Sequence, residues 1–175
     1  SRGYVVLGMR LWELAQRGSR ALRLREAALP SMEKVQARLR EHTQLAVLED
    51  DAGLILERLS HPAAGLNVAR VAGRLPLHAS SSGLVLLAHA PLDVRERVLS
   101  QPLEALTPET IVDPKRLGVL LDRVKARGFV VAPGMLSVVS TGVAVPVRSR
   151  GRVVASLSVV LPRESQQVNA AVEVL

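Results

Sequence analysis

The sequence contains no cysteine, and its 2% aromatic content consists of Tyr4, Trp12 and Phe129. The absence of cysteine excludes disulfide bonds and thiolate metal sites, and it is compatible with a reducing compartment. The shortage of aromatics means that the core is built from Leu, Val and Ala. It also argues against recognition of single-stranded nucleic acid, which relies on aromatic stacking platforms.

Long apolar runs are also missing. The longest is Leu84 to Ala88, far too short to span a bilayer, and no secretory apolar segment opens the chain. With 48% hydrophobic and 22% charged residues in 175, the composition is typical of a globular protein with one real core. We therefore expect a cytoplasmic protein without membrane contact.

Charge is unevenly distributed along the chain. The net charge is +7, and Ser1 to Glu41 carries nine Arg/Lys against four Glu, which places +5 of it in the first quarter. A basic end of this kind is found close to nucleic acid or an acidic partner. A helix with a solvated basic face explains it equally well.

Hydrophobic periodicity predicts an α+β domain with an antiparallel sheet flanked by helices. The pattern predicts helices over Arg20–Arg40 (interrupted at Pro30), Leu84–Ala90, Leu92–Ser100, Lys115–Arg127 and from Pro162 to the end. It predicts strands over Thr43–Glu49, Leu54–Leu59, Asn67–Ala72, Gly142–Val147 and Arg152–Val160. In the last strand the face of Val153, Ala155, Leu157 and Val159 is predicted to face the core, and the opposite face is partly polar.

The stretch Gly73 to Ala88 reads as a turn, a loop and a buried helix, with Ser80, Ser81 and Ser82 where that helix begins. Serines commonly cap helix starts. The free N–H groups and positive end of the helix would also suit a carboxylate or phosphate. Spacing alone favours a cap over a ligand site.

Motifs of catalysis are weak or missing. The sequence has no Gly-x-Ser-x-Gly elbow, P-loop or Gly-x-Gly-x-x-Gly. His78 beside Ser80 leaves a serine hydrolase open as a minor alternative. The four histidines lack metal-ligand spacing, so no metal or cofactor is expected, and Asp50-Asp51 reads as a turn. A pocket without catalytic groups, lined by small hydroxyl residues, fits better.

The order of motifs resembles the IclR-type transcriptional regulators. The motifs are Gly3-Tyr4-x-x-x-Gly8-x-Arg10-Leu11-x-Glu13-Leu14, Leu24-Arg25-x-x-Ala28-x-Pro30, Gly73-x-x-x-Leu77-His78-Ala79-Ser80-x-x-Gly83, Leu106-Thr107-x-x-Thr110-Ile111, Arg127-Gly128-Phe129 and Val143-Ala144-Val145-Pro146-Val147. They cover nearly the whole chain, and the element from Pro76 to Ser80 is specific in that setting.

The resemblance implies a linker helix and the end of a DNA-binding domain over residues 1–18, followed by a GAF-like effector-binding domain over residues 19–175. It implies operator DNA as a partner, bound by a winged helix-turn-helix domain before Ser1, and a homodimer or homotetramer. It also implies a small-molecule effector, often an organic or aromatic acid, and no enzymatic activity. The expected ligand-binding residues are Leu75, Ser80, Ser81, Ser82, Ala132, Ser140, Thr141, Gly142, Ser156, Ser158 and Val160.

Two positions depart from the family pattern. Leu84 stands where the family usually has lysine, and Val131 to Met135 lacks the usual acidic residues. The missing carboxylates favour a larger, more apolar ligand, or none. An effector domain reduced to a ligand-free oligomerisation module is therefore the alternative to ligand sensing.

Overall fold

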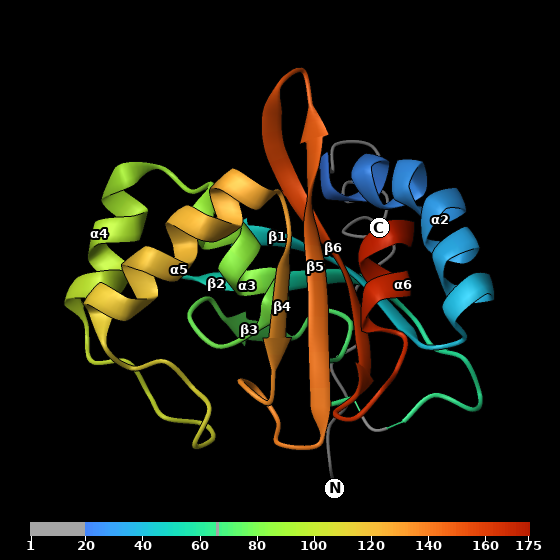
Figure 1. Cartoon of the computed structure of the whole chain (residues 1–175). Coiled ribbons are helices and arrows are strands. Elements are labelled where there is room, and N and C mark those ends of the chain that lie inside the picture. Colours follow the sequence, from blue (N-terminus) through green and yellow to red (C-terminus); the bar gives the residue numbers. More distant parts are fainter. Residues whose placement is uncertain (1–19, 66) are drawn as a thin grey trace, which may run out of the picture.

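The computed structural model describes residues 20–65 and 67–175. Its centre is one six-stranded antiparallel sheet in the order β3-β2-β1-β6-β5-β4 (Figure 1). The strands are β1 (His42–Glu49), β2 (Ala52–Leu59), β3 (Arg74–Pro76), β4 (Val130–Pro133), β5 (Ser140–Ser149) and β6 (Arg152–Pro162). The predicted α+β class is confirmed, and the predicted linker over residues 1–18 lies outside the described residues.

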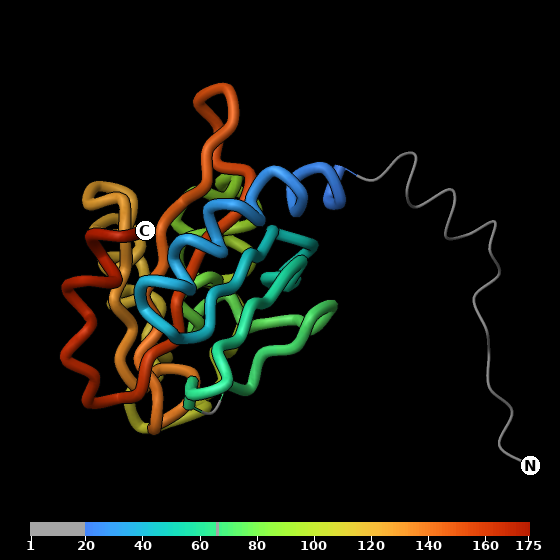
Figure 2. Tube along the Cα trace, turned by 90° about the vertical axis from the view of Figure 1, so that its right-hand side faces the viewer, coloured from blue at the N-terminus to red at the C-terminus, as the bar shows by residue number. Residues whose placement is uncertain are grey.

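Helices cover both faces of the sheet. They are α2 (Arg20–Leu39), α3 (Ser81–Ala88), α4 (Leu92–Ser100), α5 (Pro114–Arg127) and α6 (Val168–Val174). Helices α3, α4 and α5 lie on one side and α2 and α6 on the other (Figure 1). From the side, the β5–β6 hairpin rises beyond the body of the domain (Figure 2). No helix within the described ranges has the length and apolarity to cross a membrane.

The strand register decides which residues face each layer. Paired residues in an antiparallel sheet point to the same face, and successive residues alternate. Gln44 pairs with Ser158, and Gly142 pairs with Val160 and Ala132. These residues share the face of α3 and α5, where the largest core cluster lies. Val143 and Val159 lie on the opposite face with Val35, Leu39 and Ala171 from α2 and α6.

Local signals account for the helix ends. Asp113 caps α5 by accepting a hydrogen bond from the Arg116 N–H at 2.7 Å, and Pro114 occupies its first turn. Gly128 ends the helix with φ 77°, a conformation that glycine adopts without strain. Helix α2 continues as one helix through Pro30, although the sequence favours an interruption there.

One predicted strand is wrong. Residues 67–72 form a loop, and the short strand β3 follows it at Arg74–Pro76. The Asn67 side chain accepts a hydrogen bond from the Ala69 N–H at 2.9 Å, and Ala72 has φ 61°. Both features are typical of turns and not of strands. The final helix also begins later than predicted, at Val168, after turns that follow Pro162.

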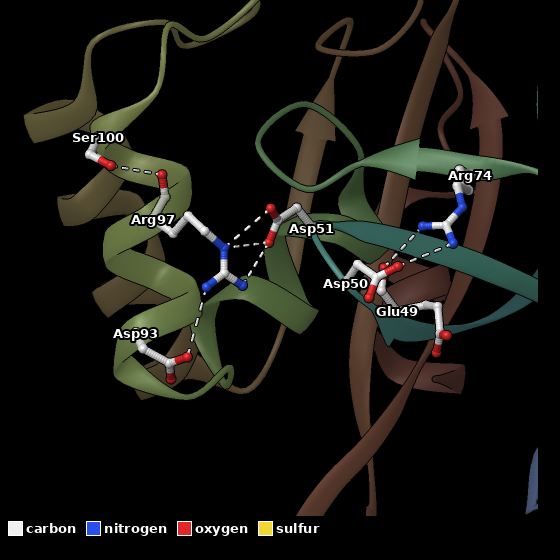
Figure 3. Close-up of polar contacts among 7 residues, drawn as sticks. All are labelled: Glu49, Asp50, Asp51, Arg74, Asp93, Arg97 and Ser100. Carbon is white, nitrogen blue, oxygen red and sulfur yellow. Dashed lines mark hydrogen bonds and ion pairs between the residues drawn. The ribbon is translucent and has the colours of Figure 1, made fainter.

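The β1–β2 turn is held from both sides by ion pairs (Figure 3). Arg97 of α4 donates to Asp51 at 2.9 to 3.2 Å, and this contact raises the pKa of Arg97 above its ordinary value. Arg74 of β3 donates to the Glu49 carbonyl at 3.2 Å and contacts Asp50 at 3.5 Å. The acidic turn therefore also ties β3 and α4 to the sheet, which helps to position the chain that enters α3.

Candidate ligand-binding site

The start of α3 is fixed by a serine cap. Ser80 Oγ accepts a hydrogen bond from the Gly83 N–H at 3.0 Å and donates to the Pro76 carbonyl at 2.7 Å. Gly83 packs against the preceding loop so tightly that a Cβ there would lie 2.5 Å from the Pro76 oxygen and 2.6 Å from Leu77 Cα. Glycine at this position therefore allows the helix to begin directly against β3.

The cap leaves hydrogen-bond donors free. The Leu84 N–H donates to the Ser80 carbonyl and the Gly83 N–H to Ser80 Oγ, so the N–H groups of Ser81 and Ser82 have no acceptor within the helix. The start of α3 is buried, since Ser81 is 8% exposed and Ser82 is 1% exposed. The positive end of a helix dipole is thus held in a poorly hydrated place, where it attracts an anionic group.

A cavity of about 110 Å³ lies at this helix start. Its walls come from the sheet, from α3 and from three loops, and among the described residues no side chain in its lining carries a charge. The lining residues are Gln44, Asn67, Val68, Ala69, Leu75, Ala79, Ser80, Ser81, Ser82, Ala132, Leu136, Ser137, Val139, Ser140, Gly142 and Val160. Apolar walls with a few convergent polar groups are typical of sites for small organic molecules.

Most of the expected ligand-binding residues line this cavity. They are Leu75, Ser80, Ser81, Ser82, Ala132, Ser140, Gly142 and Val160. Ser158 lies next to the lining, where its Oγ accepts a hydrogen bond from Ser82 Oγ at 2.9 Å. Gly142 leaves room for Ser81, because a Cβ at residue 142 would lie 2.4 Å from Ser81 Oγ.

Thr141 and Ser156 lie outside the cavity. Thr141 is a neighbour of Gly142 along β5, so the alternation of the strand turns it to the opposite face, where its Oγ1 donates to the Arg163 carbonyl at 3.2 Å. Ser156 shares the face of α3 but pairs with Ala46, further along the sheet, and it is fully buried. Neither position suits contact with a ligand in this cavity.

The sequence reasoning missed half of the cavity lining. The missed residues are Gln44, Asn67, Val68, Ala69, Ala79, Leu136, Ser137 and Val139. Most of them belong to loops, whose course is not set by periodicity. Gln44 carried a weaker signal: it lies in the predicted strand over Thr43–Glu49, where a side-chain amide that becomes buried needs a partner.

The two departures from the family pattern affect the cavity differently. Leu84 is fully buried in the core cluster and does not line the cavity. Ala132 does line it, so the segment Val131 to Met135 offers only a methyl group there. Acidic side chains would repel an anionic ligand, and their absence therefore suits a carboxylate.

The histidines near the serine cluster have structural partners. His78 Nε2 lies 2.9 Å from the Glu104 carbonyl, and Ser80 Oγ donates to the Pro76 carbonyl. A serine–histidine contact occurs elsewhere, between Ser60 Oγ and His42 Nδ1 at 2.9 Å, but His42 Nε2 faces the Gly65 carbonyl and not a carboxylate. The arrangement of a hydrolytic triad is therefore absent around Ser80 to Ser82 in the described part of the chain.

A wider hollow of about 410 Å³ lies at the start of α2, between that helix, the end of α3 and the base of the β5–β6 hairpin. Charged side chains of both signs border it, among them Arg20, Glu49 and Arg152. The cavity at α3 is smaller but combines mainly apolar walls with the free N–H groups of a buried helix start. We therefore take it as the candidate ligand-binding site.

Comparison with known proteins identifies the family. Residues 18–174 match the family model described as the bacterial transcriptional regulator IclR C-terminal domain. The chain belongs to the IclR family. The resemblance found in the sequence motifs is thereby confirmed, and the structural relatives share the α+β fold.

The most informative relatives of this IclR-family chain are two solved structures and one curated regulator. An IclR homologue of Microbacterium hydrocarbonoxydans, complexed with 4-hydroxybenzoate, is 61% identical, with a TM-score of 0.92 over 97% of this chain and 70% of that chain. An IclR homologue of Microbacterium sp. strain HM58-2 is 58% identical, with a TM-score of 0.84 over 97% of this chain and 68% of that chain.

The Pca regulon regulatory protein of Pseudomonas putida is 32% identical over 136 residues, which cover 76% of this chain. The chain spans about half the length of that curated regulator, since the match covers 47% of it. These relatives are transcriptional regulators and not enzymes, which speaks against the hydrolase alternative.

Proposed function

We propose that this chain is the effector-sensing part of a bacterial transcriptional regulator and that it binds a small aromatic carboxylate in the cavity at the start of α3. The observation that carries the proposal is the meeting of the free N–H groups of Ser81 and Ser82, both buried residues, with apolar walls in one cavity. The relative at 61% identity, complexed with 4-hydroxybenzoate, makes that compound the natural first probe.

Cavity size supports a single ring. The cavity measures about 110 Å³, which is comparable to an engineered cavity of about 150 Å³ that binds benzene. A larger apolar ligand, which the missing acidic residues suggested, would need the loops around the cavity to move apart. A ligand-free oligomerisation module is also less well supported, because such a module has no need of a cavity with free donors.

Calorimetry and thermal unfolding of the 175-residue chain test the proposal. At 4-hydroxybenzoate concentrations about 100 times Kd, binding should stabilise the domain by about 2.7 kcal/mol. For a domain of this size that raises Tm by about 5 to 10 °C. An unchanged Tm at millimolar 4-hydroxybenzoate would contradict the proposed ligand class.

Two variants of neighbouring residues on β4 test whether the ligand binds in this cavity. Ala132→Leu fills the cavity and should abolish the thermal shift. Val131→Leu enlarges a side chain on the opposite face of β4 and should keep the shift. Equal shifts in both variants would mean that the ligand binds elsewhere.

The remaining roles of the proposal concern the whole regulator. We propose that operator DNA is bound by a winged helix-turn-helix domain preceding residue 1, in a cytoplasmic homodimer or homotetramer joined through a linker over residues 1–18. Effector binding would change the arrangement of the subunits and hence operator affinity. Light scattering gives the oligomeric state, and a gel shift of the longer regulator with and without 4-hydroxybenzoate measures the coupling.

A further inference from the structure

Two buried side-chain amide nitrogens of cavity-lining residues lack hydrogen-bond partners in the described part of the chain. Gln44 on β1 is 2% exposed, and its Nε2 has no partner. Asn67, in the loop before β3, also has an unpartnered Nδ2. Both residues line the cavity. Buried polar groups are normally satisfied, so two exceptions around one cavity indicate a missing acceptor.

The loop itself accounts in part for an amide side chain at Asn67. Its Oδ1 accepts the Ala69 N–H at 2.9 Å, which fixes the amide with its nitrogen turned away from that bond. Gln44 has no comparable local role. It lies in the middle of β1, where an apolar side chain would pack against α3 without leaving a buried donor unsatisfied.

Gln44 lies close to the start of α3. Its register partner on β6 is Ser158, and Ser158 Oγ accepts a hydrogen bond from Ser82 Oγ at 2.9 Å. A rotation of the side-chain amide exchanges its oxygen and nitrogen, so Gln44 can present an N–H group to an acceptor in the cavity. The helix start and the amide can therefore donate to one ligand group.

We propose that Gln44 is a specificity-determining residue, whose amide joins the N–H groups of Ser81 and Ser82 in binding the ligand carboxylate. The inference rests on the proposed function, since it assumes a carboxylate in this cavity. Among the described residues, no Lys, Arg or His lines the cavity, so the site binds the anion without a cationic side chain. Selectivity for an acid over its neutral analogue thus depends on neutral donors.

The test compares two probes in three proteins. The probes are 4-hydroxybenzoate and 4-hydroxybenzamide, which have nearly the same shape but differ in charge. The proteins are the wild-type chain, Gln44→Leu, and Gln36→Leu as a matched control on α2, away from the cavity. Calorimetry gives Kd for each pair, and thermal unfolding without ligand gives Tm.

Gln44→Leu should weaken 4-hydroxybenzoate about ten- to hundredfold, the loss expected for one hydrogen bond to a charged group. Binding of 4-hydroxybenzamide should weaken much less, so the preference of the protein for the acid over the amide probe should shrink. The unliganded Tm should stay the same or rise, because an unsatisfied buried amide is replaced by an apolar group of similar size. Gln36→Leu should leave both affinities unchanged.

A second variant keeps the shape of the side chain. Gln44→Glu puts a carboxyl group beside the ligand carboxylate, and two such groups resist ionising together. Binding of 4-hydroxybenzoate should then become pH-dependent, lost at neutral pH and recovered as pH falls.

Three outcomes overturn the inference. If Gln44→Leu lowers the unliganded Tm and weakens both probes alike, Gln44 is only structural. If the wild type binds 4-hydroxybenzoate and Gln44→Leu keeps its preference for the acid, the inference fails while the proposed function stands. If the wild type does not bind 4-hydroxybenzoate, the proposed function fails and the inference fails with it.

Discussion

Replacing Gly83 by alanine tests whether the start of α3 depends on close backbone packing. The added Cβ would lie 2.5 Å from the Pro76 oxygen, 2.6 Å from Leu77 Cα and 2.6 Å from Ser80 Oγ. The first two atoms belong to the backbone, so the loop before α3 must move. The third is the cap itself, so the hydrogen bond from the Gly83 N–H to Ser80 Oγ is lost or weakened.

The magnitude follows from three opposing effects. Loss of an N-cap costs about 1 kcal/mol, and overpacking in a tight interior costs about 1 to 3 kcal/mol. Alanine has a helix propensity better than that of glycine by about 1 kcal/mol. The net destabilisation is about 2 kcal/mol, which lowers Tm by about 4 to 8 °C in a domain of this size.

Gly118 supplies the control. It lies inside α5, and a Cβ there would meet only Arg95 Nη2 at 3.9 Å. Gly118→Ala should therefore stabilise the domain by up to about 1 kcal/mol. Thermal unfolding followed by circular dichroism compares the two variants. A Gly83→Ala variant as stable as Gly118→Ala would refute the packing argument.

Three further predictions concern stability and the cavity. Burial raises the pKa of Glu41 above its ordinary 4.5, so the folded state binds more protons than the unfolded state, and stability falls as pH rises from 4.5 through the raised pKa. The urea midpoint of Glu41→Gln should equal that of wild type below this pH range and exceed it above the range. Equal midpoints at all pH values would contradict this. Leu121→Ala should lower the free energy of unfolding, measured with denaturant, by about 2 to 5 kcal/mol, since Leu121 is fully buried. Val119 on the same helix is 52% exposed, so Val119→Ala should change that free energy by no more than about 0.5 kcal/mol. Gly142→Ala would place its Cβ 2.4 Å from Ser81 Oγ. The affinity for 4-hydroxybenzoate, measured by calorimetry, should fall about tenfold, which corresponds to about 1.4 kcal/mol. An unchanged affinity would mean that Ser81 does not contact the ligand.

Local signals made much of the fold predictable. The Asp113-Pro114 start and the Gly128 end of α5 act through hydrogen bonds within a few residues. Helix α4 runs over Leu92–Ser100, as the pattern predicts. The apolar residues and two valines of residues 67–72 favour a strand, whereas the Asn67 turn and the positive φ of Ala72 decide the course of this loop.

Ser80 shows what the sequence by itself could determine. Three consecutive serines at a helix start predict a cap, and Ser80 forms it by accepting a short-range hydrogen bond from the Gly83 N–H. The sequence also predicted the family and the cavity-lining serines at the start of α3, because both predictions depend on motifs within short stretches. Whether the same serines face a ligand could not follow from the cap alone.

The tertiary structure decided the rest of the site. Strand register places Gln44 beside Ser158 and turns Thr141 away from the cavity, and a shift of one residue would reverse both. Residues from β1, from the loop before β3 and from the loop before β5 meet at α3. Such contacts between distant segments depend on how the chain packs around its core, and no local pattern specifies them.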